Sequence, residues 1–162
     1  MIEYEDNKEF KAAIEKMLAN KTLVELNPIR ENENVTIFSL LCIRTDKDGE
    51  YVQGKNAPIV CRKIPAPFEA LTGGQYLVIA DYYFWNHADA HQKEAKLYHA
   101  LMYINIEKGD DGALKLGTRK PDVQVFPSEV ARYGAHTDGL LNISESLKQS
   151  AKRFAESLKP KA

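Results

Sequence analysis

The chain has 162 residues, the length of a single domain that can bury roughly 70% of its extended-chain surface. Hydrophobic residues make up 44% and charged residues 28%, and the formal net charge is -1. This balance gives no sign of a nucleic-acid partner or an anionic membrane surface, and no apolar stretch approaches the roughly 18 residues that a membrane helix requires.

The first predicted element is an amphipathic helix over residues 6–19. Asp6 and Glu9 have the spacing of a capping box, which marks a helix start. The apolar residues that follow recur at helical intervals and predict one buried stripe. They are Phe10, Ala13, Ile14, Met17 and Leu18.

Two β-strands are predicted next, over residues 35–43 and 57–64, because both segments are rich in β-branched and apolar residues. The polar segment between them fits a long hairpin connection, so we expect the strands to pair as antiparallel neighbours. A third strand is predicted over residues 75–83. Its continuous apolar sequence indicates an interior position in the sheet.

A second amphipathic helix is predicted from a capping box formed by Asp89 and Gln92 to about Ile104. Its buried stripe consists of Ala95, Tyr98, Leu101 and Met102.

The remaining chain predicts a turn and short strand over residues 108–117, a short helix within 125–134 and a final amphipathic helix over 143–158, capped by Asn142 and Glu145. The sum is one α+β domain over residues 1–162, with a small, mostly antiparallel sheet covered by helices.

The run KLYHALMYI places His99 on the second predicted helix, followed by Ala100 and, one turn later, Tyr103. A zinc peptidase helix carries a glutamate and a second histidine at those two positions. Alanine does no acid–base chemistry, and a phenol that keeps its proton at neutral pH is a poor zinc ligand. We therefore expect no metal site and no catalytic residue, with His99 as the vestige of one.

Two further histidines, His87 and His91, are four residues apart. Because Asp89 is the predicted helix cap, His87 precedes the helix and His91 lies in its exposed first turn, so we expect both at the surface. No motif for a nucleophile or a phosphate loop is present in the sequence. Cys42 and Cys61 both lie in apolar strands and predict buried thiols in a reducing, cytoplasmic compartment.

Four segments resemble the putative phage metallopeptidase family, small zincin-like domains of phages and prophages, from about residue 43 to 141. They are KIPAPFEALTGGQYLVIADYYFW, HQKEAKLYHAL, DGALKLGTRKPDVQVF and ARYG. The resemblance implies a zincin-like fold and places the first zinc-binding histidine at His99, the catalytic glutamate at Ala100, the second histidine at Tyr103 and a downstream histidine at Pro121.

We interpret the chain as a zincin-like domain of phage type that has lost its metal and catalysis, requires no cofactor, and binds a host or phage protein. Inhibition of a host defence system is the most concrete version. The alternative is an atypical metal-dependent hydrolase in which His99 is joined by Asp122 and by His87 or His91. In either case we expect His99 on a helix packed against the strand around residues 77–79.

The binding surface is predicted to include aromatic side chains. Tyr82, Phe84 and Trp85 belong to one cluster with Tyr83, and strand alternation there would turn at least one ring outward. The loop residues Tyr51 and Tyr133 are further candidates.

Overall fold

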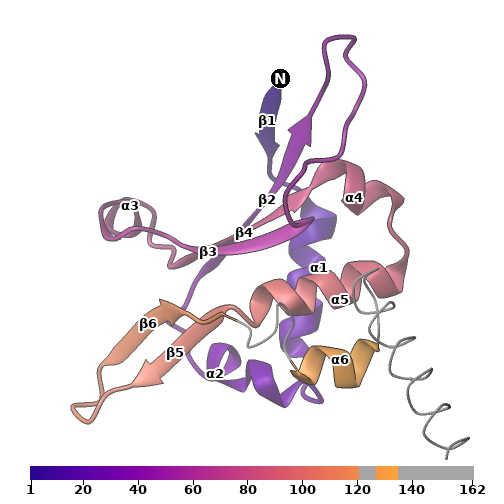
Figure 1. Cartoon of the computed structure of the whole chain (residues 1–162). Coiled ribbons are helices and arrows are strands. Elements are labelled where there is room, and N and C mark those ends of the chain that lie inside the picture. The colour runs from indigo at the N-terminus through magenta and orange to yellow at the C-terminus, as the bar shows by residue number, and fades with distance from the viewer. Residues whose placement is uncertain (121–126, 135–162) are drawn as a thin grey trace, which may run out of the picture. The chain divides into compact units, whose positions relative to one another are not determined.

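A computed structural model describes residues 1–120 and 127–134 of the chain (Figure 1). The chain divides into two compact units, Met1–Phe126 and Pro127–Ala162, and each is described here by itself. The final helix predicted over residues 143–158 lies outside the described residues, as does Asp122. Within the described part of the chain, no helix has both the length and the apolar character needed to span a membrane.

The first unit is built on a four-stranded sheet with the order β1-β2-β4-β3 (Figure 1). The strands are β1 (Ile2–Glu5), β2 (Ile37–Arg44), β3 (Ile59–Lys63) and β4 (Tyr76–Asp81). Strand β4 is interior, as predicted, but it pairs parallel to β2 and antiparallel to β3. The predicted strands over residues 35–43 and 57–64 correspond to β2 and β3. The expectation that they pair as antiparallel neighbours is therefore wrong. The most continuously apolar segment takes the central place, and the long polar connection between β2 and β3 leaves room for it.

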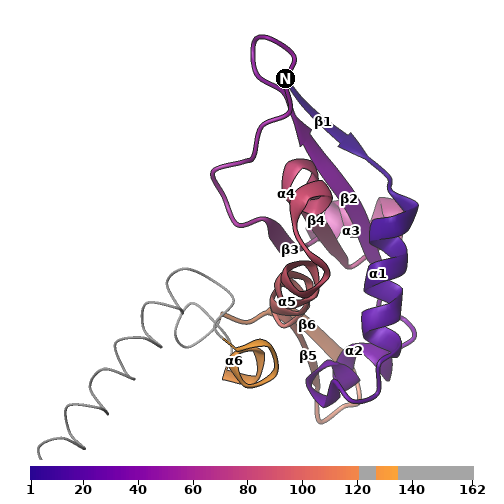
Figure 2. The ribbon, with the colours of Figure 1, turned by 90° about the vertical axis from the view of Figure 1, so that its right-hand side faces the viewer.

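The two faces of the sheet differ in how they are covered. The row Leu41–Ala80–Ile59, formed by strand register across β2, β4 and β3, is buried. On this side lie α1 (Lys8–Ala19), against β2, and α5 (Ala90–Leu101), against β3, and the two helices also contact each other (Figures 1 and 2). The opposite row, Leu40–Ile79–Val60, is only half-buried.

Helix α1 confirms the predicted buried stripe at Phe10, Ile14 and Met17. Its N-cap, however, is Asn7, whose side chain accepts a hydrogen bond from the Phe10 N–H at 3.0 Å, and not Asp6. Both residue types suit this position, and Asn7 is the one whose side chain reaches the open N–H group. The preceding strand β1 was not predicted from the sequence, because four residues with two glutamates give little strand signal.

The chain returns from α1 through a short 3₁₀ turn (Val24–Leu26) and α2 (Asn27–Arg30). The Arg30 guanidinium donates to the carbonyl oxygens of Leu18, at 2.6 Å, and Asn20, at 2.9 Å. These carbonyls belong to the end of α1, where no helical N–H group can reach them. A cation at this terminus also complements the helix dipole.

Strand β4 ends at Asp81, and the next residues form helix α4 (Tyr82–His87) instead of continuing the strand to residue 83 as predicted. Asp81 is 5% exposed and accepts three hydrogen bonds, from Phe84 N at 3.1 Å, Gly54 N at 2.9 Å and Arg44 Nη1 at 2.5 Å. The first of these caps α4. A buried carboxylate with these partners fixes the point at which strand changes to helix.

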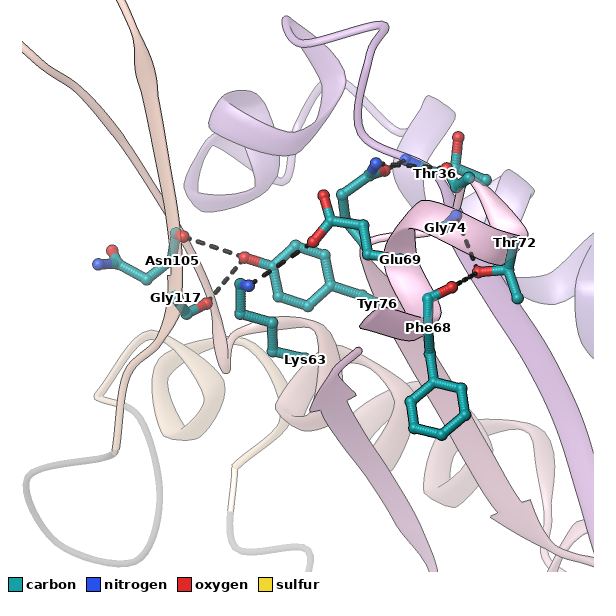
Figure 3. A network of polar contacts seen from close by, with 11 residues as sticks. Thr36, Lys63, Phe68, Glu69, Thr72, Gly74, Tyr76, Asn105 and Gly117 are labelled. Carbon is teal, nitrogen blue, oxygen red and sulfur yellow. Dashed lines mark hydrogen bonds and ion pairs between the residues drawn. The ribbon is translucent and has the colours of Figure 1, made fainter. Parts of the chain in front are cut away.

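A β-hairpin of β5 (Ile104–Lys108) and β6 (Leu114–Thr118) forms a separate two-stranded sheet after α5. It is tied to the main sheet by the Tyr76 hydroxyl, which donates to Gly117 O at 2.8 Å and lies 3.2 Å from Asn105 O (Figure 3). The short helix α3 (Ala66–Thr72) connects β3 to β4.

In the second unit, α6 (Pro127–Tyr133) confirms the short helix predicted within residues 125–134.

We expect Asp81→Ala to lower the free energy of unfolding by about 2–4 kcal/mol, because it removes the α4 cap and leaves Arg44 and the Gly54 N–H without their acceptor. Asp81→Asn can still cap α4 and should lose about half as much. Urea unfolding followed by circular dichroism measures both. Asp48→Ala, at an exposed loop position, is the control, and equal stability of Asp81→Ala and this control would refute the role given to Asp81.

Candidate functional site

Helix α5 carries His99 in its last turn, as the sequence predicts. The predicted Asp89–Gln92 capping box is present, with Asp89 Oδ1 accepting from Gln92 N at 2.8 Å and Gln92 Oε1 accepting from Asp89 N at 3.1 Å. The predicted stripe of Ala95, Tyr98, Leu101 and Met102 is buried. Helix α5 rests on β3, the neighbour of the strand around residues 77–79 against which we had placed it.

His99 is half-buried, and its ring lies edge-on to that of Tyr103, with 5.3 Å between the centroids and 67° between the planes. Tyr103 is not helical, because α5 ends at Leu101 and Tyr103 lies in the turn before β5. The two side chains are thus neighbours although only one of them stands on the helix. Ala100, between them in sequence, is 1% exposed and faces the core.

The end of α5 is held by Arg119, the first residue after β6. Its Nε donates to Met102 O at 2.5 Å, and its backbone N–H donates to Tyr103 O at 2.9 Å. A guanidinium at this position satisfies a terminal helix carbonyl and complements the helix dipole. The turn that carries Tyr103 is therefore fixed by contacts from the hairpin.

His87 and His91 stand on other parts of the helical segments than His99. His87 ends α4, where its ring stacks on Tyr83 at 4.1 Å between centroids and its Nδ1 lies 2.7 Å from Tyr83 O. His91 stands in the first turn of α5, eight residues before His99, which separates them by about 12 Å along the helix axis. One metal ion cannot bridge that distance, so the alternative that joins His99 to His91 does not fit the helix.

The side chains around His99 do not make a zinc site within the described residues. Over residues 1–120 and 127–134, no three histidine, cysteine, aspartate or glutamate side chains come together in a way that could hold a metal ion. A catalytic zinc requires three protein ligands and an open position. Asp122 and Pro121, which enter the two sequence-based hypotheses, lie outside the described residues.

The thiols offer no activated nucleophile. Cys42 is 2% exposed, and both cysteines are free. Burial raises the pKa of the Cys61 thiol to about 12, because the thiolate would lose its hydration in the space between the sheet and its helices. Only the thiolate attacks, so Cys61 is chemically inert at neutral pH.

The predicted aromatic cluster is helical and mostly covered. Trp85 is 3% exposed and packs edge-on against Phe10, with 4.7 Å between the centroids, so it belongs to the core. The expectation of strand alternation there is wrong, since all four residues lie in α4. Tyr82 and Phe84 are half-buried, as is Tyr133 on α6 of the second unit. Their role in binding stays a prediction.

Tyr51 adds to this cluster from the loop between β2 and β3. Its ring lies 4.8 Å from that of Tyr82, and the residue is 52% exposed. Asp81 holds Arg44, at which β2 ends and the loop begins, and the backbone of Gly54 within the loop. Sequence analysis missed this support, because nothing in the loop sequence indicates that its backbone binds a strand-end carboxylate.

The structure thus defines an α+β fold whose helix α5 carries His99 in its last turn. The chain belongs to the family described as putative phage metallopeptidase, whose model matches residues 2–158. This confirms the family resemblance drawn from the sequence motifs. No curated protein and no solved structure gives a significant match.

We expect neither thiol to be alkylated by iodoacetamide at pH 8 while the protein is folded. Cys42 is out of reach, and a thiol with a pKa of about 12 is ionised in roughly one molecule in ten thousand at that pH. Mass spectrometry after timed exposure measures the reaction, with the urea-unfolded chain as the control that reacts at both positions. Rapid labelling of folded Cys61 would contradict the assigned burial.

We further expect the purified protein to hold far less than one zinc per chain, because one imidazole cannot supply the three or four ligands of a stable site. Elemental analysis of the wild type beside His99→Ala is the measurement. The two should give the same low value. Close to one zinc per wild-type chain, lost in His99→Ala, would establish a metal site that this ligand set does not explain.

Proposed function

We propose that this member of the phage metallopeptidase family is catalytically inactive and acts by binding a protein of the host or the phage. The observation that carries the proposal is the position of Ala100. The family resemblance assigns the catalytic glutamate to this position, and the residue there is 1% exposed and has no ionisable group. Position 100 therefore offers a metal-bound water no general base.

The replacement of the second ligand supports the same proposal. Tyr103 contacts His99 through its ring edge at a centroid distance of 5.3 Å, and its backbone is fastened to Arg119. These contacts pack the position that the resemblance gives to a second zinc-binding histidine. A domain with such a packed site can retain its fold for binding alone.

The proposed setting is the cytoplasm of a bacterial host, where inhibition of a defence system is the most concrete form of the function. This step rests on analogy with the compact genomes of phages, in which a retained domain is expected to have a use. Within the predicted aromatic surface, the pair Tyr51 and Tyr82 is the part that reaches solvent, because Tyr51 is 52% exposed. Exposed aromatic rings of this kind often anchor protein interfaces.

The second candidate function is an atypical hydrolase that uses His99. It would require ligands from residues 121–126 or 135–162, since the described residues supply no second and third ligand. Loss of hydrolysis in His99→Ala is the outcome that would favour it.

The test is affinity capture of a partner from host lysate, followed by reconstitution with the purified partner. We expect His99→Ala to bind the partner as wild type does, and the protein to hydrolyse neither casein nor the partner when zinc is supplied. A protease activity that disappears in His99→Ala would instead identify the surroundings of His99 as the working site and refute the proposal.

We expect Tyr51→Ala and Tyr82→Ala to weaken binding of that partner by about tenfold or more each if the aromatic surface is the interface. Calorimetric titration measures the affinity, and Tyr4→Ala, at a 59% exposed position on β1, is the matched control. Unchanged affinity in both variants would place the interface elsewhere.

A further inference from the structure

A broad apolar groove lies along the face of the sheet opposite α5 and reaches the first turn of α1. Strand register sets Phe38, Leu77 and Arg62 in one row across β2, β4 and β3, with Leu40 and Ile79 in the next row on the same face. A groove of about 930 Å³ lies over part of this surface and continues onto α3. Among the described residues it is larger than the hollow of about 530 Å³ that is lined by α1 and α5.

Helix α3 adds Phe68 to one wall of the groove and carries a second exposed apolar side chain, Leu71, outside the lining. Phe68 is 60% exposed, and Leu71, one turn further along, is 82% exposed. No residue of α3 is buried, and Figure 1 shows the helix lying beyond the ends of β3 and β4. A helix that buries nothing contributes little to the core, so its two large apolar residues need another explanation.

The wall formed by α3 is nevertheless well fixed (Figure 3). Glu69 pairs with Lys63 at 3.8 Å, and the Thr72 hydroxyl donates to Phe68 O at 2.7 Å. The helix ends at Gly73, whose left-handed backbone, with φ of 73°, suits glycine. A preformed wall lowers the entropy cost of binding.

The floor is fixed by a close contact between Phe38 and Gly74. A methyl group added at Gly74 would clash with the Phe38 ring in its present position, so the ring packs directly over the backbone of this glycine. Phe38 remains 37% exposed in this position. An aromatic ring held at the floor of an open apolar groove is an anchor point for a partner's side chain.

The rim of the groove is predominantly basic. Lys11, Arg62 and Lys63 line it, with Asp6 as the one acid among its lining residues. Lys63 pairs with Glu69, while Lys11 and Arg62 are exposed and form no ion pair within the described ranges 1–120 and 127–134. The uncompensated charge of the rim is therefore positive.

We propose that this groove is the docking site for a protein segment that presents one or two large apolar side chains flanked by carboxylates. The apolar side chains would cover Phe38, Phe68 and Leu71, and the carboxylates would meet Arg62 and Lys11. This inference rests on the proposed binding function and assigns it a second surface, distinct from the pair Tyr51 and Tyr82, together with the chemistry of the partner segment. Complementary charge at such a rim raises the association rate and selects the partner.

The first experiment pans a phage-displayed library of random 12-residue peptides on the full-length wild-type chain, with parallel counter-selection on Phe68→Ser/Leu71→Ser. Peptides enriched on the wild type alone are expected to combine aromatic or aliphatic residues with aspartate or glutamate. Absence of wild-type-specific peptides, or enrichment of basic ones, would overturn the proposal.

The second experiment measures the best peptide by fluorescence polarisation. Arg62→Glu should weaken binding by about tenfold and reduce its salt dependence, and Phe68→Ser/Leu71→Ser should weaken it at least as much. The matched controls are Lys115→Glu and Leu114→Ser, at exposed positions on β6, which should bind as wild type. Equal losses in the controls would show that the groove is not the site.

The same variants are tested against single-stranded DNA and against vesicles that contain phosphatidylserine, since a basic rim can also attract these anions. Binding to either that depends on Arg62, without peptide binding, would overturn the proposal. A partner captured from lysate whose binding survives the groove substitutions would leave the proposed binding function standing and refute only this surface. Hydrolysis that depends on His99 would refute the binding function itself.

Discussion

The Asp81 carboxylate, buried at the end of the central strand, is the contact on which the arrangement of this domain depends. It accepts from the guanidinium of the neighbouring strand, from the backbone of the long loop and from the first turn of α4. Because a buried carboxylate is stable only with such donors, strand, loop and helix must meet at this point. These contacts set the direction of α4. Because α5 begins soon after α4 along the chain, they also set where α5 starts, and α5 carries His99 in its last turn.

The sheet of the first unit uses its two faces for different purposes. One face buries Tyr76, Val78 and Ala80 under α1 and α5 and supplies the stability of the domain. The other keeps Phe38 partly exposed and is bordered by a helix with no buried residue. An apolar core on one side of the sheet and an open apolar face on the other suit the proposed binding role, because the open face can be covered without disturbing the core.

The elements with strong local signals could be predicted from sequence. The capping box at Asp89, the stripe of α5 and the interior strand at 76–81 all follow from rules that act within a few residues. The parallel pairing of β2 and β4 could not be predicted, since it depends on which strand, distant in sequence, comes to lie between β2 and β3. Likewise, Asp81 ends β4 through partners 27 and 37 residues away, which no local pattern records. For the candidate site, the helical position of His99 could be predicted from the sequence, whereas the groove depends on which face of the sheet the helices leave open.

The strand order has a consequence for the way the chain assembles during synthesis. Strand β4 follows β2 and β3 along the chain but lies between them in the sheet. Until residue 81 has left the ribosome, β2 and β3 have no common partner, and the apolar residues of both stay uncovered. Such non-local pairing is slow and leaves strand edges open to other chains. The facing edges of β2 and β3 therefore stay open until β4 inserts between them.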